Sequence, residues 1–225
     1  PLLKINGLSI ISHVFKKAEE ANIGEVLVAT EDQEIIDDVK NNGGRAILTS
    51  NNHKTGTDRI FEALKKIDSS NVDLIMNLQG DEPLMDIDDM RNLNDKMIKN
   101  NSKLGTLASK ILDKQIYDKQ SVVKVETNES LNNLNFPEAT NFTRKISVQK
   151  NNIYHHLGIY CYQKDTLKNF VSSKQSPGEI KNRLEQLRAL DNSIKINVAL
   201  SKASPIGIDT KEDYVAIKKI MEYKS

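Results

Sequence analysis

The sequence predicts an α/β fold with a mainly parallel sheet and helices on both faces. Short apolar runs alternate with stretches whose apolar residues recur at helical spacing. Strands that are joined through helices pair in parallel and are covered by those helices. With 225 residues, of which 38% are hydrophobic, the chain is long enough to bury a sizeable core. We therefore expect a single domain spanning residues 1–225.

The first third of the chain shows this alternation most clearly. The predicted helices lie around residues 11–18, 35–39 and 57–67, and the predicted strands at 25–29, 46–48 and 72–78. Asp32 is placed to cap the second helix, which Gly43 and Gly44 are expected to end. Strand 72–78 is the most apolar, as expected of a strand buried on both faces.

The remainder of the chain is less regular. Residues 122–125 and 159–162 are predicted strands, separated by a polar stretch, 127–152, that we interpret as a hairpin and loop region. A helix is predicted over 177–190, with Ile180, Leu184, Leu187 and Leu190 facing inward, and a strand over 194–200. Thr210 and Asp213 form a variant capping box that opens a last helix through Met221.

Composition narrows the class of partner. Lys and Arg total 32 against 31 Asp and Glu, and the charges are interspersed, so neither nucleic acid nor a membrane surface is expected to bind. No apolar stretch approaches the roughly 18 residues of a membrane span. The single cysteine, Cys161, excludes an internal disulfide and favours a reducing compartment. We expect a cytoplasmic protein that binds small molecules.

The segment Gln79–Gly80–Asp81–Glu82–Pro83 gives the strongest local signal, because it follows the most apolar strand directly. Ligands collect at the carboxyl ends of strands in open α/β sheets. Asp81 could supply one hard oxygen to Mg²⁺, and Gly80 would let the backbone approach a nucleotide. The alternative is a polar turn, which Gly, Asp and Pro also favour.

A second carboxylate lies at the start of the last predicted helix, again just beyond a strand. Asp209 there could be the other ligand of a magnesium ion. The alternative is that it caps the helix or complements its dipole, a common role for Asp at such a position. The pairing with Asp81 is the observation that favours metal binding by Asp209 over helix capping.

Four further segments carry polar groups of interest. The adjacent His155 and His156 lie beside a strand and are poorly placed to chelate one metal, so a hydrogen bond to substrate or a structural role is expected instead. Segment 185–188 reads as a solvated helix face, and Arg144 as a possible anion clamp. Residues 53–59 could hold a nucleobase or phosphate, or simply cap a helix.

These segments together resemble the 3-deoxy-manno-octulosonate (Kdo) cytidylyltransferase, or CMP-Kdo synthetase, family. The match runs in order along nearly the whole chain, which makes it specific. The matching blocks are Pro1-Leu2-Leu3 with Ile5-Asn6-Gly7, Val28-Ala29-Thr30, 53–59, 78–83, 156–160, 184–188 and 207–210. The resemblance implies a nucleotidyltransferase fold of the glycosyltransferase-A type, with a mixed, mainly parallel sheet and a smaller β-rich lobe, at about 110–165, that forms a homodimer.

The resemblance also implies roles for individual residues. Asp81 and Asp209 would hold Mg²⁺; Thr55, Gly56, Thr57, Arg59, Gln79 and Gly80 would face the nucleotide; Arg144, His156, Tyr160, Glu185 and Gln186 would contact the acidic sugar. Arg144 matches the family's Phe-Ser-Arg segment, with Thr143 in place of serine. The implied reaction is attack of the anomeric hydroxyl of Kdo on the α-phosphorus of CTP, which yields CMP-Kdo for lipopolysaccharide biosynthesis.

Two further expectations follow from the resemblance. Family members begin with a strand and a basic, glycine-containing phosphate loop that ends just before the Pro-Leu found here as Pro1-Leu2, and this sequence does not contain that segment. Alternative activities are a cytidylyltransferase for 8-amino-Kdo or for a sialic-acid-like sugar, or a catalytically silent nucleotide-binding homologue. A sialic-acid-type enzyme would carry a Gln-Pro-Thr-type segment in place of residues 79–83, so it ranks lower.

Overall fold

The structure is a computed structural model that describes residues 1–113, 117, 119–146, 151–204 and 207–223. The chain forms two compact units. The first comprises Pro1–Ser70, Leu78–Arg91 and Pro205–Ser225, and the second comprises Asn71–Asn77 and Asn92–Ser204. The prediction of one domain over 1–225, with a smaller lobe at about 110–165, stays a prediction.

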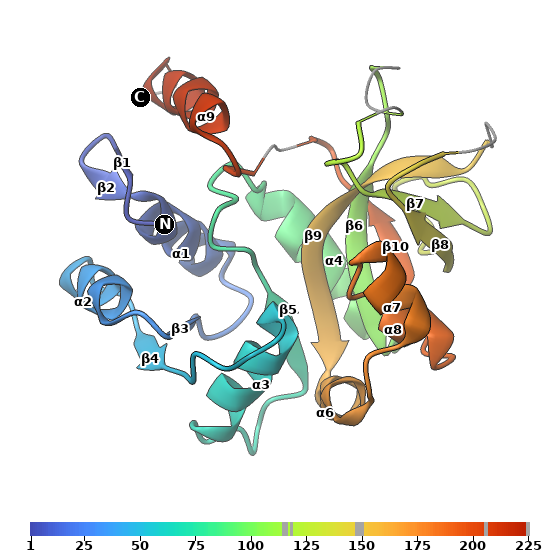
Figure 1. Ribbon diagram of the computed structural model, residues 1–225, viewed down its shortest axis with the longest axis horizontal. Helices are drawn as coiled ribbons and strands as arrows, with labels where there is room; N and C mark the ends of the chain where they lie inside the picture. The colour runs from blue at the N-terminus through green and yellow to red at the C-terminus, as the bar shows by residue number, and fades with distance from the viewer. Residues whose placement is uncertain (114–116, 118, 147–150, 205–206, 224–225) are drawn as a thin grey trace. The chain divides into compact units, whose positions relative to one another are not determined.

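The first unit contains most of the predicted helices (Figure 1). Its elements are the antiparallel pair β1 (Lys4–Ile5) and β2 (Leu8–Ser9), the parallel pair β3 (Val28–Thr30) and β4 (Ala46–Leu48), and helices α1 (Ile10–Ala21), α2 (Gln33–Asn41), α3 (Gly56–Lys65) and α9 (Lys211–Tyr223). Helix α4 (Ile87–Asn100) begins in this unit and continues into the second. The predicted helices of this unit are confirmed, β4 matches the predicted strand 46–48, and β3 begins three residues later than the predicted strand 25–29.

Local capping explains where these helices begin. Ser9 accepts a hydrogen bond from the Ser12 amide at 3.1 Å, and Asp32 accepts one from the Glu34 amide at 2.8 Å. The predicted Thr210–Asp213 box is confirmed, since each residue accepts a hydrogen bond from the other's amide.

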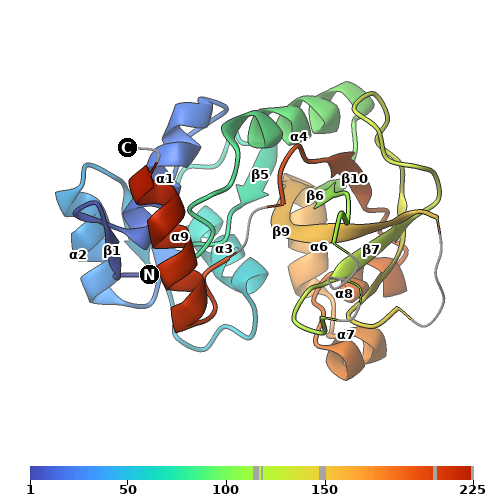
Figure 2. The ribbon, with the colours of Figure 1, turned by 90° about the horizontal axis from the view of Figure 1, so that it is seen from above.

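The second unit is built on a six-stranded sheet. Its order is β10-β6-β9-β7-β8, and β5 also pairs with β9. The strands are β5 (Leu74–Asn77), β6 (Leu104–Ser109), β7 (Lys124–Thr127), β8 (Ala139–Thr143), β9 (Ile153–Gln163) and β10 (Asn197–Leu200). Figure 2 shows α4 on one face, and α6 (Lys164–Ser172), α7 (Pro177–Asn182) and α8 (Leu187–Asp191) on the other.

The α/β class and the mixed sheet are confirmed. Parallel pairing is rarer than predicted, however: among the described strands it joins β3 to β4 and β6 to β10, and the other pairs are antiparallel. The reason is β9, which follows the predicted hairpin region rather than a crossover helix. Its neighbours β5, β6 and β7 therefore all run in the opposite sense.

The single helix predicted over 177–190 is wrong. Arg183 adopts a left-handed conformation (φ 53°), which ends α7, and α8 begins only at Leu187. Leu184 and Leu187 are buried as predicted, whereas Ile180 is 62% exposed and Leu190 is half-buried. The break turns the two short helices so that the Glu179 and Arg188 side chains meet.

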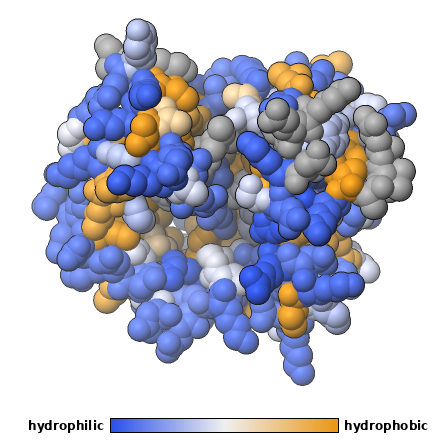
Figure 3. Space-filling model, turned by 45° about the horizontal axis from the view of Figure 1, so that its top comes forward, coloured by the Kyte–Doolittle hydropathy of each residue, from blue (hydrophilic) through white to orange (hydrophobic). Residues whose placement is uncertain are grey.

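The surface agrees with the charge pattern of the sequence. Hydrophilic residues cover most of the face in view in Figure 3, with small hydrophobic patches among them. Within the described ranges, no helix has both the length and the apolar character needed to traverse a lipid bilayer. Cys161 is a free, buried thiol whose pKa burial raises to about 12, so it is chemically inert.

Gly44 offers a test of the packing in the first unit. A Cβ there would lie 2.8 Å from two ring atoms of Phe15 and from Cγ1 of Val39, both in the buried core. We expect Gly44→Ala to destabilise the protein by about 1–3 kcal/mol, because neither neighbour has room to move. Thermal unfolding followed by circular dichroism measures the change.

Gly24→Ala is the matched control, since a Cβ at Gly24 meets open space. Its melting temperature should equal or slightly exceed that of the wild type. Equal melting temperatures for the Gly44→Ala variant and this control would contradict the packing described for Phe15 and Val39.

Candidate functional site

A cleft of about 670 Å³ in the first unit is formed by the loop after β5 and the start of α9. The Ile208 amide donates to the Asp81 carbonyl at 3.0 Å, which joins these two segments. The cleft is lined by Pro1, Leu3, Ile10, Gln79, Gly80, Asp81, Ile208, Asp209, Thr210, Lys211 and Tyr214. The structure thus brings Asp209 to the consecutive residues Gln79, Gly80 and Asp81, which lie far from it in the sequence.

Gly80 is needed at this loop for packing. A Cβ at this position would lie 2.9 Å from Cδ1 of Ile11, on helix α1. A larger residue would therefore require the Ile11 side chain or the loop beside Asp81 to shift. The glycine lets the main chain lie closely against the helix.

Two carboxylates near the cleft, those of Asp81 and Glu82, have raised pKa values. Burial raises the pKa of Asp81, and the charge of Asp209 raises it further. Glu82 has a pKa raised to about 7, mainly by burial and then by Asp81 and Asp209. Among the described residues, Glu82 Oε2 is buried without a hydrogen-bond partner. This concentration of negative charge is an environment that a cation would relieve.

The donor set is compatible with a hard cation such as Mg²⁺. Asp81 and Asp209 offer hard carboxylate oxygens, which that ion prefers. Within the described ranges, no group of three or more His, Cys, Asp or Glu side chains is arranged to hold a metal ion. A protein that supplies only one or two carboxylates leaves the remaining positions of the octahedron to water and substrate phosphates, which is how Mg²⁺ is usually bound.

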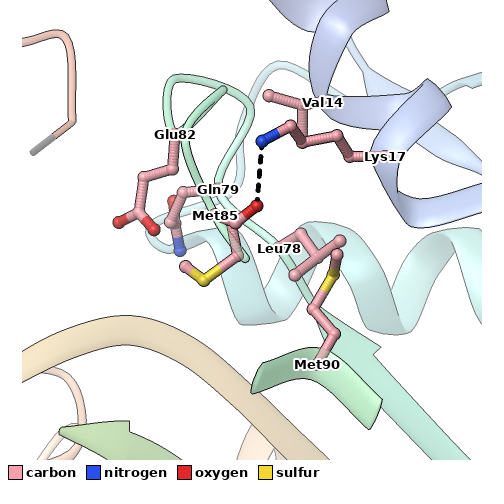
Figure 4. Close-up of a pocket in the computed structure, with 7 residues that line it drawn as sticks. All are labelled: Val14, Lys17, Leu78, Gln79, Glu82, Met85 and Met90. Atoms are coloured by element: carbon pink, nitrogen blue, oxygen red, sulfur yellow. Dashed lines mark hydrogen bonds between the residues drawn. The ribbon is translucent and has the colours of Figure 1, made fainter. Parts of the chain in front are cut away.

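A small cavity lies between α1 and the loop after β5, which carries Asp81 and Glu82 (Figure 4). The Gln79 and Glu82 side chains both line it, and Lys17 reaches across from α1 to donate to the Met85 carbonyl at 3.2 Å. Its volume of about 10 Å³ leaves room for about one water molecule. The loop that carries Asp81 is therefore held from behind by α1.

The predicted nucleotide segment at 55–59 starts helix α3. Thr55 caps the helix by accepting from the Asp58 amide at 3.3 Å, and a Cβ at Gly56 would meet open space. Thr57 is buried, and Arg59 pairs with Glu31 and donates to Thr49 Oγ1 at 2.8 Å. The described residues that line the cleft do not include this segment, so its role stays a prediction.

His156 and Tyr160 lie together on β9 in the second unit. Their ring centroids are 5.4 Å apart, although four residues of regular strand span about 13 Å. A β-bulge between them accounts for the difference, because adjacent residues of β6 pair with Tyr160 and with Leu157. Burial, and secondarily His155, lowers the pKa of His156 to about 3, so its ring is neutral.

Glu185 and Gln186 were predicted to lie in the middle of a helix. They lie instead in the turn between α7 and α8. Gln186 is buried and Glu185 half-buried. The turn is held by a buried ion pair: Arg188 donates to both carboxylate oxygens of Glu179, at 2.8 and 2.6 Å. Arg188 is 2% exposed, so the interpretation of 185–188 as a solvated face is wrong.

Arg144 lies at the end of β8 and binds main chain. Its Nη1 donates to the carbonyls of Gln120 and Ser121 at 3.2 and 3.1 Å. The buried Lys124 ammonium donates to the Arg144 carbonyl at 3.0 Å. In the structure, this arginine therefore organises the segment before β7, and its role as an anion clamp stays a prediction.

Sequence reasoning missed three features of these sites: the burial of Glu82, the Glu179–Arg188 pair, and the contacts of Thr106, which is fully buried beside His156. Glu82 belongs to segment 79–83, the strongest local signal in the sequence, but no local pattern in that segment predicts that its carboxylate is buried. The other two depend on a helix break and a strand register that no local pattern reveals.

Comparison with known proteins places these sites in context. A family model described as cytidylyltransferase matches residues 1–196. The chain is 40% identical over 232 positions to the 3-deoxy-manno-octulosonate cytidylyltransferase of Thermodesulfovibrio yellowstonii, covering 98% of this chain and 91% of that relative. It is 38% identical to the protein of the same name from Rhodopseudomonas palustris, covering 99% and 91%.

Solved structures agree with these relatives. CMP:2-keto-3-deoxy-manno-octonic acid synthetase complexed with CTP superposes with a TM-score of 0.90 at 33% identity, covering 100% of this chain and 92% of that one. UDP-glucose pyrophosphorylase, at 12% identity, superposes with a TM-score of 0.73, covering 100% of this chain and 90% of that one. This second likeness extends to the fold alone.

The neutral His156 predicts a specific pH dependence of stability. Between its pKa of about 3 in the folded chain and the usual 6.5 in the unfolded chain, only the unfolded chain binds the proton. The stabilisation is thus complete above pH 6.5 and is lost as the pH falls toward 3. Relative to His156→Gln, the wild type should lose about 1.4 kcal/mol per pH unit in this range.

Urea unfolding of both proteins, at intervals from about pH 7 down to about pH 5, measures this difference. A His155→Gln variant separates the contribution of the neighbouring ring, whose pKa burial also lowers. Parallel curves of stability against pH for the wild type and the His156→Gln variant would contradict the neutral assignment.

Proposed function

The chain belongs to the 3-deoxy-manno-octulosonate (Kdo) cytidylyltransferase family, as its sequence motifs predict, and on that premise we propose that it transfers CMP from CTP to Kdo. The anomeric hydroxyl of Kdo attacks the α-phosphorus of CTP, the bond to the β-phosphate oxygen breaks, and CMP-Kdo and pyrophosphate form. The observation that carries the proposal is the cleft that joins Gln79–Gly80–Asp81 to Asp209 in a chain of this family.

Asp81 and Asp209 would hold Mg²⁺, together with oxygens of the triphosphate. The ion would neutralise phosphate charge as a Lewis acid when it is bound. Gln79 and Gly80, which line the same cleft, would face the cytidine, together with Thr55, Gly56, Thr57 and Arg59 at the start of α3. The close packing of Gly80 on Ile11 fixes the loop that carries Gln79 and Asp81 before the nucleotide binds.

Residues of the second unit would hold the acidic sugar. His156 and Tyr160 present two adjacent rings on β9, and Glu185 and Gln186 are fixed by the turn between α7 and α8. Arg144 would contact the sugar carboxylate. His156 and Gln186 are buried polar groups. Such groups bind a matching hydroxyl or carboxylate selectively, because without it they are left unpaired.

No side chain needs to act as a nucleophile in this reaction. Phosphoryl and nucleotidyl transfer depend on holding the attacking and leaving oxygens in line and on neutralising charge. The residues of the chain would therefore act by binding and orienting the two substrates. Release of pyrophosphate from CTP that depends on added Kdo, with formation of CMP-Kdo, tests the proposal directly.

We also propose that the protein works as a cytoplasmic homodimer that supplies CMP-Kdo for lipopolysaccharide biosynthesis. The free, buried thiol of Cys161 suits a reducing compartment. The side chains of Leu112 and Leu134 in the second unit are 91% and 93% exposed, an arrangement that a subunit contact would cover. Light scattering of the purified protein measures its mass in solution.

Asp81→Asn tests the magnesium assignment. The change removes one charge from the ligand set and preserves shape, so folding should be little changed. We expect the magnesium concentration needed for half-maximal turnover to rise at least about 10- to 100-fold, the range found for residues that only orient a metal ligand. Calorimetric titration of Mg²⁺ in the presence of CTP gives a second readout that is independent of turnover.

Asp165→Asn, an exposed change at the start of α6, is the control and should leave both measurements unaltered. If Asp81→Asn retains the wild-type magnesium dependence, Asp81 serves as a turn residue and the assignment fails.

Gln186→Ala tests the sugar assignment. Removing the amide should reduce kcat/KM for Kdo about five- to a hundred-fold and leave CTP affinity intact, because one hydrogen bond to a sugar group is worth about 1–3 kcal/mol. Steady-state kinetics in Kdo and calorimetric titration of CTP measure the two effects. Equal losses toward both substrates, accompanied by a lowered melting temperature, would indicate a structural role.

A further inference from the structure

Thr106 on β6 has an unusual set of contacts. It is fully buried, and its hydroxyl lies 2.7 Å from the Ile159 carbonyl oxygen, 3.3 Å from the Leu157 carbonyl oxygen and 3.0 Å from His156 Nε2. All three partners belong to β9: His156 and Leu157 precede the β-bulge, and Ile159 lies within it. One hydroxyl group thus joins the bulge to the histidine ring.

The proton count at this hydroxyl determines which nitrogen of His156 carries hydrogen. A carbonyl oxygen only accepts, and a hydroxyl has one proton to donate. At 2.7 Å, the Ile159 contact requires that proton, because two oxygens at this distance repel each other without one. Nε2 must then donate to the hydroxyl oxygen, so the neutral ring is protonated on Nε2 and carries its lone pair on Nδ1.

We propose that Thr106 is a positioning residue that fixes His156 in the Nε2–H tautomer and holds the bulge that brings Tyr160 beside it. Nδ1 of His156 then serves as a hydrogen-bond acceptor for a hydroxyl group of the sugar. This inference rests on the proposed function insofar as it concerns the sugar. The tautomer and the bulge rest on the geometry of β6 and β9 alone.

The surroundings of the ring support a single fixed orientation. Phe142 packs edge-on against His156, with centroids 5.0 Å apart and planes at 84°, and the centroid of the tilted Tyr160 ring lies 5.4 Å from that of His156. The ring is therefore confined by aromatic neighbours while one nitrogen is bound to Thr106. A ring that is held in this way presents its lone pair in one direction, which lowers the entropy lost on binding.

Thr106→Val and Thr106→Ser separate the hydroxyl from the shape of the side chain. Thr106→Val removes the hydroxyl and should raise KM for Kdo about tenfold, the effect of one misplaced hydrogen bond, with KM for CTP unchanged. Thr106→Ser retains the hydroxyl and should restore the wild-type value. Ser109→Ala is the matched control: it removes a buried hydroxyl from the same strand that has no hydrogen-bond partner among the described residues.

Nuclear magnetic resonance of protein with ¹⁵N-labelled histidine reads the tautomer without any substrate. The chain has four histidines, and a His156→Gln spectrum identifies the signals of His156. We expect an Nε2–H ring in the wild type and in the Thr106→Ser variant, and a mixture of tautomers or an Nδ1–H ring in Thr106→Val. A wild-type His156 protonated on Nδ1 overturns the inference, even if Thr106→Val fails to fold.

The two readouts also distinguish this inference from the proposed function. A wild type that forms no CMP-Kdo refutes the proposed function and leaves the tautomer measurement valid. An active wild type whose tautomer and KM for Kdo are both unchanged by Thr106→Val refutes the inference and leaves the proposed function intact.

Discussion

Strand β9 is the element on which the second unit depends, because it pairs with β5, β6 and β7. A strand enclosed in this way must satisfy its backbone hydrogen bonds within the sheet, so its register is closely constrained. The bulge in β9 interrupts that register, and the buried hydroxyl of Thr106 bonds the carbonyls of Leu157, just before it, and Ile159, within it. The last residue of β5, Asn77, pairs with Tyr160. The same strand therefore determines the position of the His156 and Tyr160 rings and of the strand end from which the chain continues into Gln79 and Asp81.

The parts of the fold that the sequence predicts are those with local causes. Helices α1, α2, α3 and α9 were predicted because apolar spacing, and for α2 and α9 a capping residue, lie within a few positions of each other. The break between α7 and α8 was missed because Arg183 takes up a left-handed conformation without a glycine or proline to signal it. That conformation is compensated by the bidentate contact of Arg188 with Glu179, which exists only after the chain has turned. Strand direction was misjudged for a related reason, since β9 reverses through a hairpin region and not through a helix.

In the candidate site, too, the features with local causes could be predicted and those that depend on distant residues could not. Asp81 and Asp209 could be predicted because each follows a predicted strand and the chain order matches a known family, and the structure places both in one cleft. The burial of Glu82 could not be predicted, since it depends on how the loop packs on α1. His156 was singled out from its neighbours in the sequence. Its neutral state and its contact with Thr106 follow from a register shift of the sheet, which depends on residues fifty positions apart.

Two glutamates illustrate how differently the fold treats buried carboxylate oxygens. Burial raises the pKa of Glu179, but hydrogen bonds from Arg188 and Gln175 outweigh that effect and leave the pKa below its ordinary value. Its charge is matched inside the fold, so it stabilises the turn between α7 and α8. For Glu82, burial acts in the same direction as the charges of Asp81 and Asp209, and its pKa rises to about 7. A chain that keeps acidic groups in such an environment sacrifices stability there, and it regains that stability only when positive charge arrives with a ligand. The magnesium ion proposed for this cleft would bring that charge.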